Sequence, residues 1–246
     1  MASFDTLGNI IILPEKTKNP KKTAERLLKQ HKNIKTVAIK TGNYSGIYRT
    51  PKLKILAGKR TKTTIYKENN IILKLNPETC YFSTRLSTER KRIASLVKTG
   101  EEILVLFSGV MPYPAVLAKN TKAKSITGIE INPRAHKFAE ENLKLNKITN
   151  VKLYLGDVKK ILPKLNKFDR IIMPLPKDAE SFLNIAIKHL KKNGVIHFYD
   201  FQFEQDIPEK TIEKIKKYCK PKIILVKKCG NYSPRKYRVV ADFKIN

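Results

Sequence analysis

The feature that most constrains the fold of this chain is an alternation of apolar runs and helix-like segments between residues 101 and 219. Apolar runs at 101–107, 124–131, 150–157, 168–175 and 194–201 are each followed by helical spacing, at 114–121, 132–147, 158–165, 177–192 and 207–219. Apolar strands that alternate with helices predict a parallel sheet covered on both faces. The β-rich residues 222–228 and 235–245 have no helix between them, so they predict a closing antiparallel hairpin with its junction at 229–235.

Residues 1–75 have a shorter rhythm, which predicts a small α+β domain. A helix is expected at 20–31, because Pro20 fits the first helical turn. Short strands are expected at 9–13, 35–40, 53–58, 63–68 and 70–75. We therefore predict two domains, a small one over residues 1–75 and a Rossmann-like one over residues 76–246.

The charge balance points to a polyanionic partner. The chain has 51 Lys and Arg residues against 21 Asp and Glu residues, a net charge of +30 that is spread along its length. An excess of positive charge strengthens binding to nucleic acid, because neutralising phosphates releases counterions. The alternative is a coding bias in which solvated lysines cover neutral faces, although such a bias is usually matched by glutamate. Nucleic acid is the favoured partner.

The cysteines and the apolar runs exclude several other classes of protein. Cys80, Cys219 and Cys229 lie far apart without a C-x-x-C motif, which favours neither a zinc site nor a disulfide framework. No apolar stretch approaches the length of a membrane span, and the N-terminus lacks the pattern of a signal peptide. We expect a cytoplasmic protein with no metal and no membrane association.

Three predicted strands end in candidate ligand residues, at the edge of a parallel sheet where ligands bind. Gly109 would let backbone amides approach a ligand, although ordinary strand-to-helix turns also use glycine. Glu130 has the position to accept two ribose hydroxyls, or to complement the dipole of the next helix. Asp157 has the position to accept from an adenine amino group, or to cap the following helix.

Taken together, this order of glycine, acid and aspartate is typical of an α/β fold, the class I S-adenosylmethionine-dependent methyltransferase (Rossmann-like) sheet. S-adenosylmethionine has no phosphates, so it needs fewer glycines than a dinucleotide does. The fourth predicted strand ends in Pro174-Leu175-Pro176. These residues offer no side-chain carbonyl to an exocyclic amine, which favours a ring nitrogen, or another carbon or nitrogen, as the target.

Several segments together carry a resemblance to a known family. They are GIYRTPKLKILAG (46–58), CYFSTRLSTERKRIASLV (80–97), LFSGVMPY (106–113), IEINPRAHKFAEENLKLNK (129–147), DRIIMPLPKDAESFL (169–183) and YSPRKYRVVADFKI (232–245). From Gly46 onward the chain resembles the archaeal and eukaryotic tRNA (guanine-N1)-methyltransferases, which modify the base 3′ to the anticodon. The same superfamily contains the methyltransferase of 4-demethylwyosine and the aminocarboxypropyl transferase of wybutosine synthesis.

The resemblance implies a tRNA (guanine(37)-N1)-methyltransferase that uses S-adenosyl-L-methionine, with C7 methylation of 4-demethylwyosine as a possible second activity. The alternatives are aminocarboxypropyl transfer and a non-catalytic tRNA-binding protein of the same fold. The implied partner is the anticodon stem-loop of tRNA, gripped by the small domain and the basic face while the target base is extruded. We expect a monomer.

The resemblance also implies residue roles. Glu89 would be the general base that removes the N1 proton, and Arg49 would meet O6 of guanine. Tyr81 and Arg85 would hold the cofactor site and the tRNA, and Arg90 would approach the methionine end of the cofactor. The implied cofactor-binding residues are Tyr81, Arg90, Phe107, Gly109, Val110, Pro112, Glu130, Ile131, Asp157, Val158 and Pro174. The implied RNA-binding residues are Arg49, Arg85, Pro174, Pro176 and Lys177. Read without the resemblance, residues 87–90 are also an ordinary capped helix start.

Four positions depart from the family pattern. Val105 stands where the family usually has an acid, and Met111 stands where it has a second glycine. Thr84 replaces a usual proline, and Pro174 replaces an asparagine that would contact guanine. These departures motivate the alternative of a binding protein that has lost its cofactor, whereas Glu89, Glu130 and Asp157 favour an enzyme.

Overall fold

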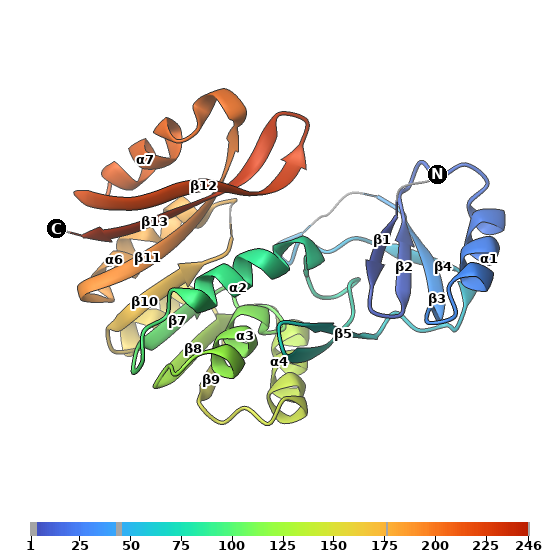
Figure 1. The fold of residues 1–246 in the computed structure, drawn as a ribbon, viewed down its shortest axis with the longest axis horizontal. Coiled ribbons are helices and arrows are strands. Elements are labelled where there is room, and N and C mark those ends of the chain that lie inside the picture. The colour runs from blue at the N-terminus through green and yellow to red at the C-terminus, as the bar shows by residue number, and fades with distance from the viewer. Residues whose placement is uncertain (1–3, 43–45, 176, 246) are drawn as a thin grey trace.

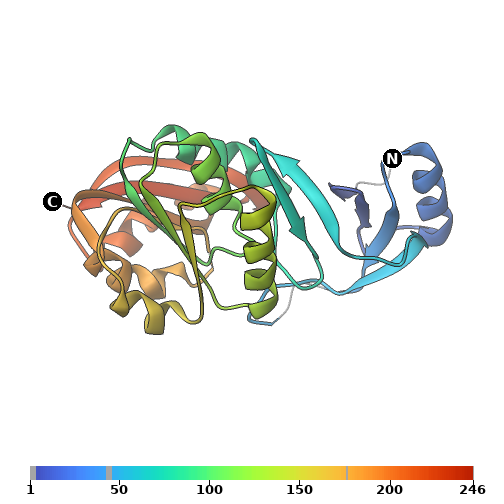
Figure 2. The ribbon, with the colours of Figure 1, turned by 90° about the horizontal axis from the view of Figure 1, so that it is seen from below.

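The computed structural model describes residues 4–42, 46–175 and 177–245 of the chain. Two bodies follow one another along the molecule, a small N-terminal sheet with one helix and a larger seven-stranded sheet with helices on both faces (Figure 1). The view from below shows the small sheet at one end of an elongated molecule (Figure 2).

The N-terminal body is a four-stranded sheet in the order β1-β2-β3-β4. Its elements are β1 (Asp5–Leu7), β2 (Ile10–Leu13), α1 (Pro20–Gln30), β3 (Thr36–Lys40) and β4 (Leu53–Gly58). Helix α1 starts at Pro20, as the sequence predicts, and crosses from β2 to its parallel neighbour β3. Ala24 and Leu27 on its apolar face pack against buried residues of these strands, so burial of one helical stripe forms this small core.

A two-stranded hairpin lies between the two sheets. It consists of β5 (Thr64–Glu68) and β6 (Ile71–Leu75), joined by two asparagines, Asn69 and Asn70, which both have positive φ angles. Hairpin turns of two residues favour asparagine at such angles. The hairpin buries its apolar side chains in the core of the large sheet, and Asn142 and Asn146 bind its backbone. The predicted domain boundary after residue 75 stays a prediction.

The large sheet has the strand order β12-β13-β11-β10-β7-β8-β9. Its strands are β7 (Glu102–Leu106), β8 (Ser125–Glu130), β9 (Val151–Leu155), β10 (Phe168–Met173), β11 (Leu190–Phe203), β12 (Pro221–Ser233) and β13 (Lys236–Ile245). Strands β7 to β11 pair in parallel, and β13 is antiparallel to both of its neighbours. The predicted parallel sheet with a terminal antiparallel hairpin is therefore confirmed, but the junction expected at 229–235 is wrong, because β12 continues to Ser233. The chain changes direction across the sheet between β7 and β10, where such folds bind their ligands.

Helices cover both faces of this sheet and divide its core in two. The helices are α2 (Ser87–Ser95), α3 (Pro112–Asn120), α4 (Pro133–Leu145), α5 (Val158–Ile161), α6 (Leu183–Lys188) and α7 (Glu209–Lys216). Short 3-10 turns are η1 (Thr84–Leu86), η2 (Leu162–Lys164), η3 (Ala179–Phe182) and η4 (Glu204–Asp206). One core lies under α2, α3 and α4, and the other lies under α5, α6 and α7. Continuous apolar strands supply both cores, as the sequence predicts.

Three predicted helices are shorter than expected, and the one expected at 207–219 is α7, which spans only Glu209–Lys216. The segment 177–192 forms η3 and α6, which ends at Lys188, and β11 begins at Leu190, which pairs with Phe168. The apolar spacing that predicts a longer helix arises because Leu190 packs into the core of the sheet. The segment 158–165 continues only as a 3-10 turn after Ile161, where Pro163 lacks a backbone donor.

Candidate active site

The loop between β7 and α3 has an unusual backbone. Phe107, Gly109 and Met111 all have positive φ angles, of 55°, 57° and 66°. Only glycine adopts such angles without strain, which explains why a glycine suits position 111. Met111 is instead fully buried, and Val110 beside it is buried too, so packing holds the loop in shape. Pro112 then starts α3.

Glu130 at the end of β8 is bound to this loop. Its Oε2 atom accepts the backbone N–H of Gly109 at 2.6 Å, and its Oε1 atom accepts the N–H of Asn132 at 2.8 Å. Burial raises the pKa of Glu130, against the opposing effect of these backbone hydrogen bonds. The next residue, Ile131, is 45% exposed. The structure thus brings together the two strand ends that the sequence singled out.

The end of β9 lies beside Glu130, because the N–H of Gly156 donates to the Glu130 carbonyl at 2.8 Å. Asp157 caps α5 by accepting the N–H of Lys159 at 2.8 Å, and Val158 is buried. The capping interaction weighed from the sequence is therefore present. It uses one carboxylate oxygen, Oδ1.

The loop after β10 meets the N-terminal part of the chain. Arg49 has a positive φ angle of 51° and donates from Nη2 to the Lys177 carbonyl and to Asp178 Oδ2, both at 3.0 Å. Pro174 lies half-buried at the start of this loop. Pro176 lies outside the described residues.

These strand ends fit a nucleoside, with acceptors for two ribose hydroxyls and an apolar wall for the face of an aromatic base. In the described part of the chain, the buried hydroxyl of Ser108 has no hydrogen-bond partner. A Cβ atom on Gly109 would have the Tyr81 carbonyl, at 3.8 Å, as its only close neighbour, so space adjoins the loop. The ring of Phe107 packs against Phe182 at 4.9 Å and provides an apolar wall. The residues present therefore suit S-adenosylmethionine.

Glu89 lies in α2 and is 4% exposed. Both of its oxygens accept hydrogen bonds from Arg92, at 2.8 and 2.7 Å, and Oε1 also accepts the hydroxyl of Tyr199 at 2.7 Å. Tyr199 lies 3.0 Å from the hydroxyl of Tyr113, and burial raises the pKa of both phenols. Glu89 is thus a buried carboxylate with a fixed cation.

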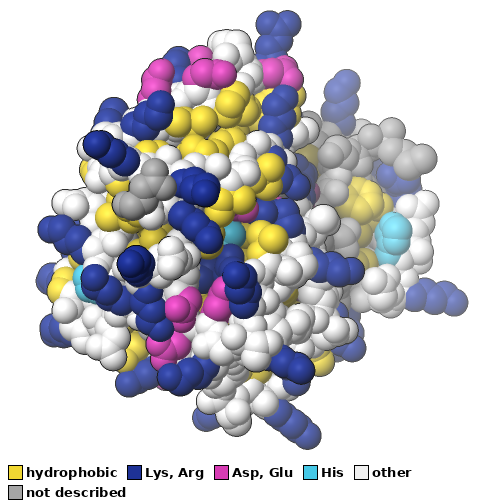
Figure 3. Space-filling model, turned by 60° about the vertical axis from the view of Figure 1, so that its left-hand side comes forward, with side chains coloured by type: hydrophobic (Ala, Val, Ile, Leu, Met, Phe, Trp, Pro, Cys, Tyr) yellow, Lys and Arg dark blue, Asp and Glu magenta, His cyan; other side chains and the backbone are white. Residues whose placement is uncertain are grey.

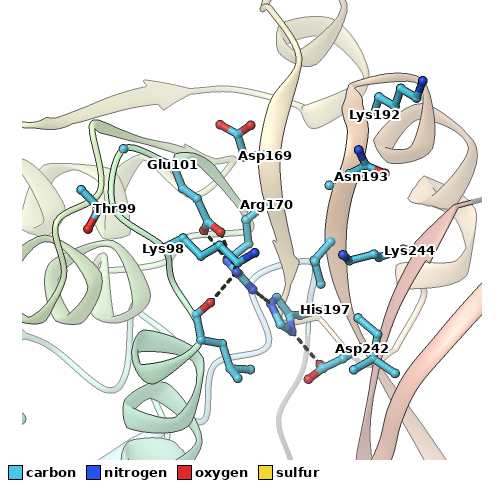
Figure 4. A pocket seen from close by; sticks show the side chains of 15 residues that line it. Lys98, Thr99, Glu101, Asp169, Arg170, Lys192, Asn193, His197, Asp242 and Lys244 are labelled. Atoms are coloured by element: carbon cyan, nitrogen blue, oxygen red, sulfur yellow. Dashed lines mark hydrogen bonds and ion pairs between the residues drawn. The ribbon is translucent and has the colours of Figure 1, made fainter.

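The polar network continues from Arg92 beneath α2. Arg92 also donates to Asp242 Oδ2 at 2.7 Å, and His197 lies 2.6 Å from Asp242 Oδ1. His197 must accept from Arg170 Nη1, at 2.7 Å, because a guanidinium only donates. Burial lowers the pKa of His197, which agrees with a neutral ring that donates to Asp242. Figure 4 shows this row from Asp242 through His197 and Arg170 to Glu101, with which Arg170 pairs.

The row in Figure 4 lines a cavity of about 420 Å³. Lys98, Glu101 and Asn193 line it at the N-terminal ends of β7 and β11. It therefore lies at the edge of the sheet opposite to the loop of Gly109.

Three further expected site residues have structural partners. Arg90 is 1% exposed and pairs through two nitrogens with Glu68 of β5. Tyr81 is 40% exposed, and its hydroxyl accepts from Arg238 at 2.9 Å. Arg85 is exposed and pairs with Asp5 at 2.8 Å. The structure places Arg90 in an interface between α2 and the hairpin, and Arg85 against the N-terminal sheet.

Sequence reasoning missed the partners of Glu89. Tyr199 and His197 alternate with apolar residues in a buried strand, and Asp242 lies in another one. Polar residues at every second position of such strands indicate a polar layer under a helix. This pattern is the sequence signal that points to the partners of Glu89.

Basic side chains are distributed over the face drawn in Figure 3, and acidic ones form only small groups there. Among the described residues no cluster of three or more His, Cys, Asp or Glu side chains could hold a metal ion. Within the same part of the chain, every helix is too short or too polar to cross a bilayer.

Two family descriptions match the chain. Residues 64–227 match the TRM5/TYW2 methyltransferase domain, and residues 1–61 match the TYW2 N-terminal domain. The tRNA (guanine(37)-N(1))-methyltransferase Trm5b of Pyrococcus abyssi is 41% identical over 99% of this chain and 75% of its own length. The tRNA (guanine(37)-N(1))/4-demethylwyosine(37)-methyltransferase Taw22 of Nanoarchaeum equitans is 34% identical over 96% of this chain and 97% of its own.

Solved structures show the same likeness. The structure of aTrm5 in complex with tRNALeu has a TM-score of 0.90 and 32% identity, and the match covers 99% of this chain and 72% of that one. The structure of Methanocaldococcus jannaschii TYW2 in complex with AdoMet has a TM-score of 0.77 and 28% identity. That match covers 99% of this chain and 100% of the other.

Proposed function

The chain belongs to the TRM5/TYW2 methyltransferase family, and we propose on this premise that it transfers a methyl group to N1 of guanine 37 in tRNA. It is an S-adenosylmethionine-dependent tRNA methyltransferase. The observation that carries the proposal is the contact between Gly109 and Glu130, which supports a nucleoside site at the strand ends of a chain 41% identical to Trm5b.

The cofactor, when bound, supplies a methyl group on a positively charged sulfur. A carboxylate has about four acceptor positions, and the backbone of Gly109 and Asn132 uses two of those on Glu130. We assign the remaining two to the ribose hydroxyls. Asp157 caps α5 with Oδ1, and we assign its other oxygen to the adenine amino group.

Glu89 is the residue that we assign to the N1 proton. Guanine N1 is a weak acid, so its attack on a methyl group requires a base within hydrogen-bond reach. Glu89 accepts two hydrogen bonds from Arg92 and one from Tyr199, which leaves one acceptor position on Oε2 that we assign to the N1 proton. The N1 proton would then face a carboxylate that the Arg92 guanidinium holds in place through both oxygens.

Arg49 is the residue that we assign to O6 of guanine, where negative charge develops as N1 loses its proton. Its contacts with Lys177 and Asp178 support this assignment, because they hold a residue of the N-terminal part against the loop after β10. The small domain and the basic surface would then bind the anticodon stem-loop, in agreement with the net charge of +30.

The test is to incubate the purified chain with S-adenosylmethionine and tRNA bearing guanosine 3′ to the anticodon, and to identify the product nucleosides by mass. 1-Methylguanosine is expected. An aminocarboxypropyl adduct would move the chain to the transferase branch. Tight binding of tRNA without any product would favour a non-catalytic binding protein.

A second activity, C7 methylation of 4-demethylwyosine, is favoured by the likeness to Taw22, which covers nearly the whole of both chains. Pro174 supports it, because the loop there lacks an asparagine that would select guanine. The same assay with tRNA that bears 4-demethylwyosine tests this activity. A methylated tricyclic base would make the enzyme bifunctional.

A further inference from the structure

A group of aromatic and basic side chains lies at the end of the large sheet where β11 stops and β12 turns into β13. This group, which we term the hairpin patch, consists of Tyr81, Phe201, Phe203, Tyr232, Lys236 and Arg238. Tyr232 is 61% exposed and Phe203 is 45% exposed. In Figure 1 the turn between β12 and β13 lies on the side of the large sheet that carries the N-terminal sheet.

The hairpin patch continues the strand face that holds Glu89. Side chains alternate between the two faces of a strand, so Tyr199, Phe201 and Phe203 share one face of β11. Tyr199 binds Glu89, and Phe201 follows about 7 Å further along the strand. Arg238 and Lys236 of β13 stand opposite Phe201 and Phe203 in the sheet register. The patch therefore directly adjoins the proposed catalytic residue.

Rings and cations are in contact throughout the patch. The Tyr232 and Phe201 rings lie 4.2 Å apart with an interplanar angle of 39°. Lys236 Nζ lies 5.0 Å from the centre of the Phe203 ring and 5.8 Å from that of Tyr232. The Arg238 guanidinium lies 5.5 Å from the centre of the Phe201 ring.

Arg238 also carries an unused donor. It is 9% exposed and donates from Nη2 to Tyr81, yet its buried Nε atom has no hydrogen-bond partner within the described residues. The nearby acid Glu204 is paired with Lys228 at 2.6 Å, so it does not offset the charge of Lys236 and Arg238. The patch is thus apolar in its rings and positive between them.

This combination fits a nucleobase and its phosphate. Exposed rings interleaved with cations bind single-stranded nucleic acid, since every base has a face that stacks and every nucleotide has a phosphate. We propose that the hairpin patch stacks an unpaired nucleobase next to the target nucleotide on Tyr232, with the phosphate of that nucleotide against Lys236. The proposal rests on the proposed function, which places the target base at Glu89. This stacking would be a second contact with the RNA, and it would keep the neighbouring base unpaired beside the extruded one.

The test uses the full chain and an anticodon stem-loop RNA with 2-aminopurine on either side of the target guanosine. Stacking on an aromatic ring quenches 2-aminopurine fluorescence. With Tyr232→Ala we expect the quenching to disappear at one flanking position and the Kd for the RNA to rise about tenfold. Tyr232→Phe keeps the ring and is expected to bind as the wild type does. Tyr218→Ala removes another exposed tyrosine, at the end of α7, and is the matched control.

Lys236→Gln tests the phosphate contact separately. The slope of log Kd against log salt concentration is expected to fall by about one, since one phosphate contact is lost. Unchanged quenching and an unchanged Kd in Tyr232→Ala, with thermal melting like that of the wild type, would overturn the proposal. So would equal losses in Tyr232→Phe and Tyr232→Ala, because the ring would then have no role.

The outcomes separate this proposal from the proposed function. Formation of 1-methylguanosine by the wild type, together with normal RNA binding by Tyr232→Ala, would overturn the stacking contact alone. If the wild type formed no methylated product, the assignment of methyl transfer would fail. Loss of RNA binding in Tyr232→Ala would still support the hairpin patch in that case.

Discussion

Arg92 binds both oxygens of Glu89 from the next turn of α2, and it shares its remaining nitrogen with Asp242. The three side chains are largely enclosed beneath the helix, with exposed fractions of 17% for Arg92, 4% for Glu89 and 3% for Asp242. One guanidinium thus compensates two buried carboxylates, and its removal has consequences for stability that differ from its consequences for catalysis.

Arg92→Met should lower the free energy of unfolding by about 3 kcal/mol, because it leaves buried charge without a partner. Glu89→Gln in the same background should recover part of that loss, since it removes one of the two stranded charges. Urea denaturation of the single variants and the double variant measures this coupling. Strictly additive effects would show that the two side chains do not interact in solution.

Glu89→Gln should lower kcat by at least about 100-fold while leaving the Kd for S-adenosylmethionine and for tRNA unchanged, because only proton removal is lost. Tyr199→Phe removes one hydrogen bond to the same carboxylate and should have a smaller effect. Thr88→Ala, on the exposed side of α2, is the control. Single-turnover methylation separates the chemical step from binding. Full activity of Glu89→Gln would rule out its role as the base.

Cofactor affinity should fall as the pH drops below neutral, and it should begin to fall at a higher pH than an exposed glutamate would give. Burial raises the pKa of Glu130, so the folded protein favours the protonated form more than an exposed glutamate would. The ionised form is the one assigned to the ribose, so affinity is complete above this pKa and is lost as the pH falls through it. Titration calorimetry at several pH values measures this. Glu130→Gln should bind more weakly than the wild type at neutral pH, and its affinity should depend little on pH. If the affinity of this variant fell with pH as that of the wild type does, the titrating group would be another one.

Arg49→Ala should lower kcat/KM for tRNA by about 100-fold, because one donor to the developing charge is lost. Affinity for S-adenosylmethionine should not change. Asp178→Asn breaks the ion pair of Arg49 but keeps the guanidinium, and it should retain most of the activity. This pair is exposed, so neither variant should change the stability by more than about 1 kcal/mol. Equal losses in both variants would mean that the ion pair, and not the free guanidinium, is what matters.

Asp242 should make stability sensitive to acid. Burial alone would raise its pKa, but hydrogen bonds from His197 and Arg92 prevail and lower it to about 2. The folded pKa lies below the unfolded one, so the stabilisation of about 2 kcal/mol is present above pH 4 and is lost as the pH falls toward 2. In urea titrations, the free energy of unfolding of Asp242→Asn should fall less than that of the wild type between pH 4 and pH 2. If the stability of this variant depended on pH as that of the wild type does, another group would be responsible for the acid sensitivity.

Much of this architecture could be predicted because its signals are local. Apolar runs fix the parallel strands, Pro20 fixes the start of α1, and the ends of parallel strands place Gly109 and Glu130 at one edge of the sheet. The segment 177–192 shows where local signals stop. Leu190 fits a helical period, yet its packing in the sheet decides the outcome.

The partners of Glu89 depend on pairing between distant parts of the chain. Arg92 is three residues away, but Tyr199 and Asp242 follow more than 100 residues later, and only the strand register brings them under α2. Likewise, composition does not distinguish Arg49 from the other basic residues among the 51 of the chain, and the fold places it against the loop after β10. Long-range pairing decides which polar side chains share a buried site.

Asn142 of α4 and Asn146, the residue that follows this helix, bind the backbone of β6 as a neighbouring strand would. Asn146 accepts the N–H of Ile72 at 2.8 Å and donates to its carbonyl at 2.6 Å, and Asn142 does the same at Lys74, at 2.7 and 3.1 Å. An unpaired strand edge is a template for association with other chains, and here side-chain amides occupy it. The amide protons of Ile72 and Lys74 should therefore exchange slowly with solvent, as if this short ribbon were in the middle of a sheet.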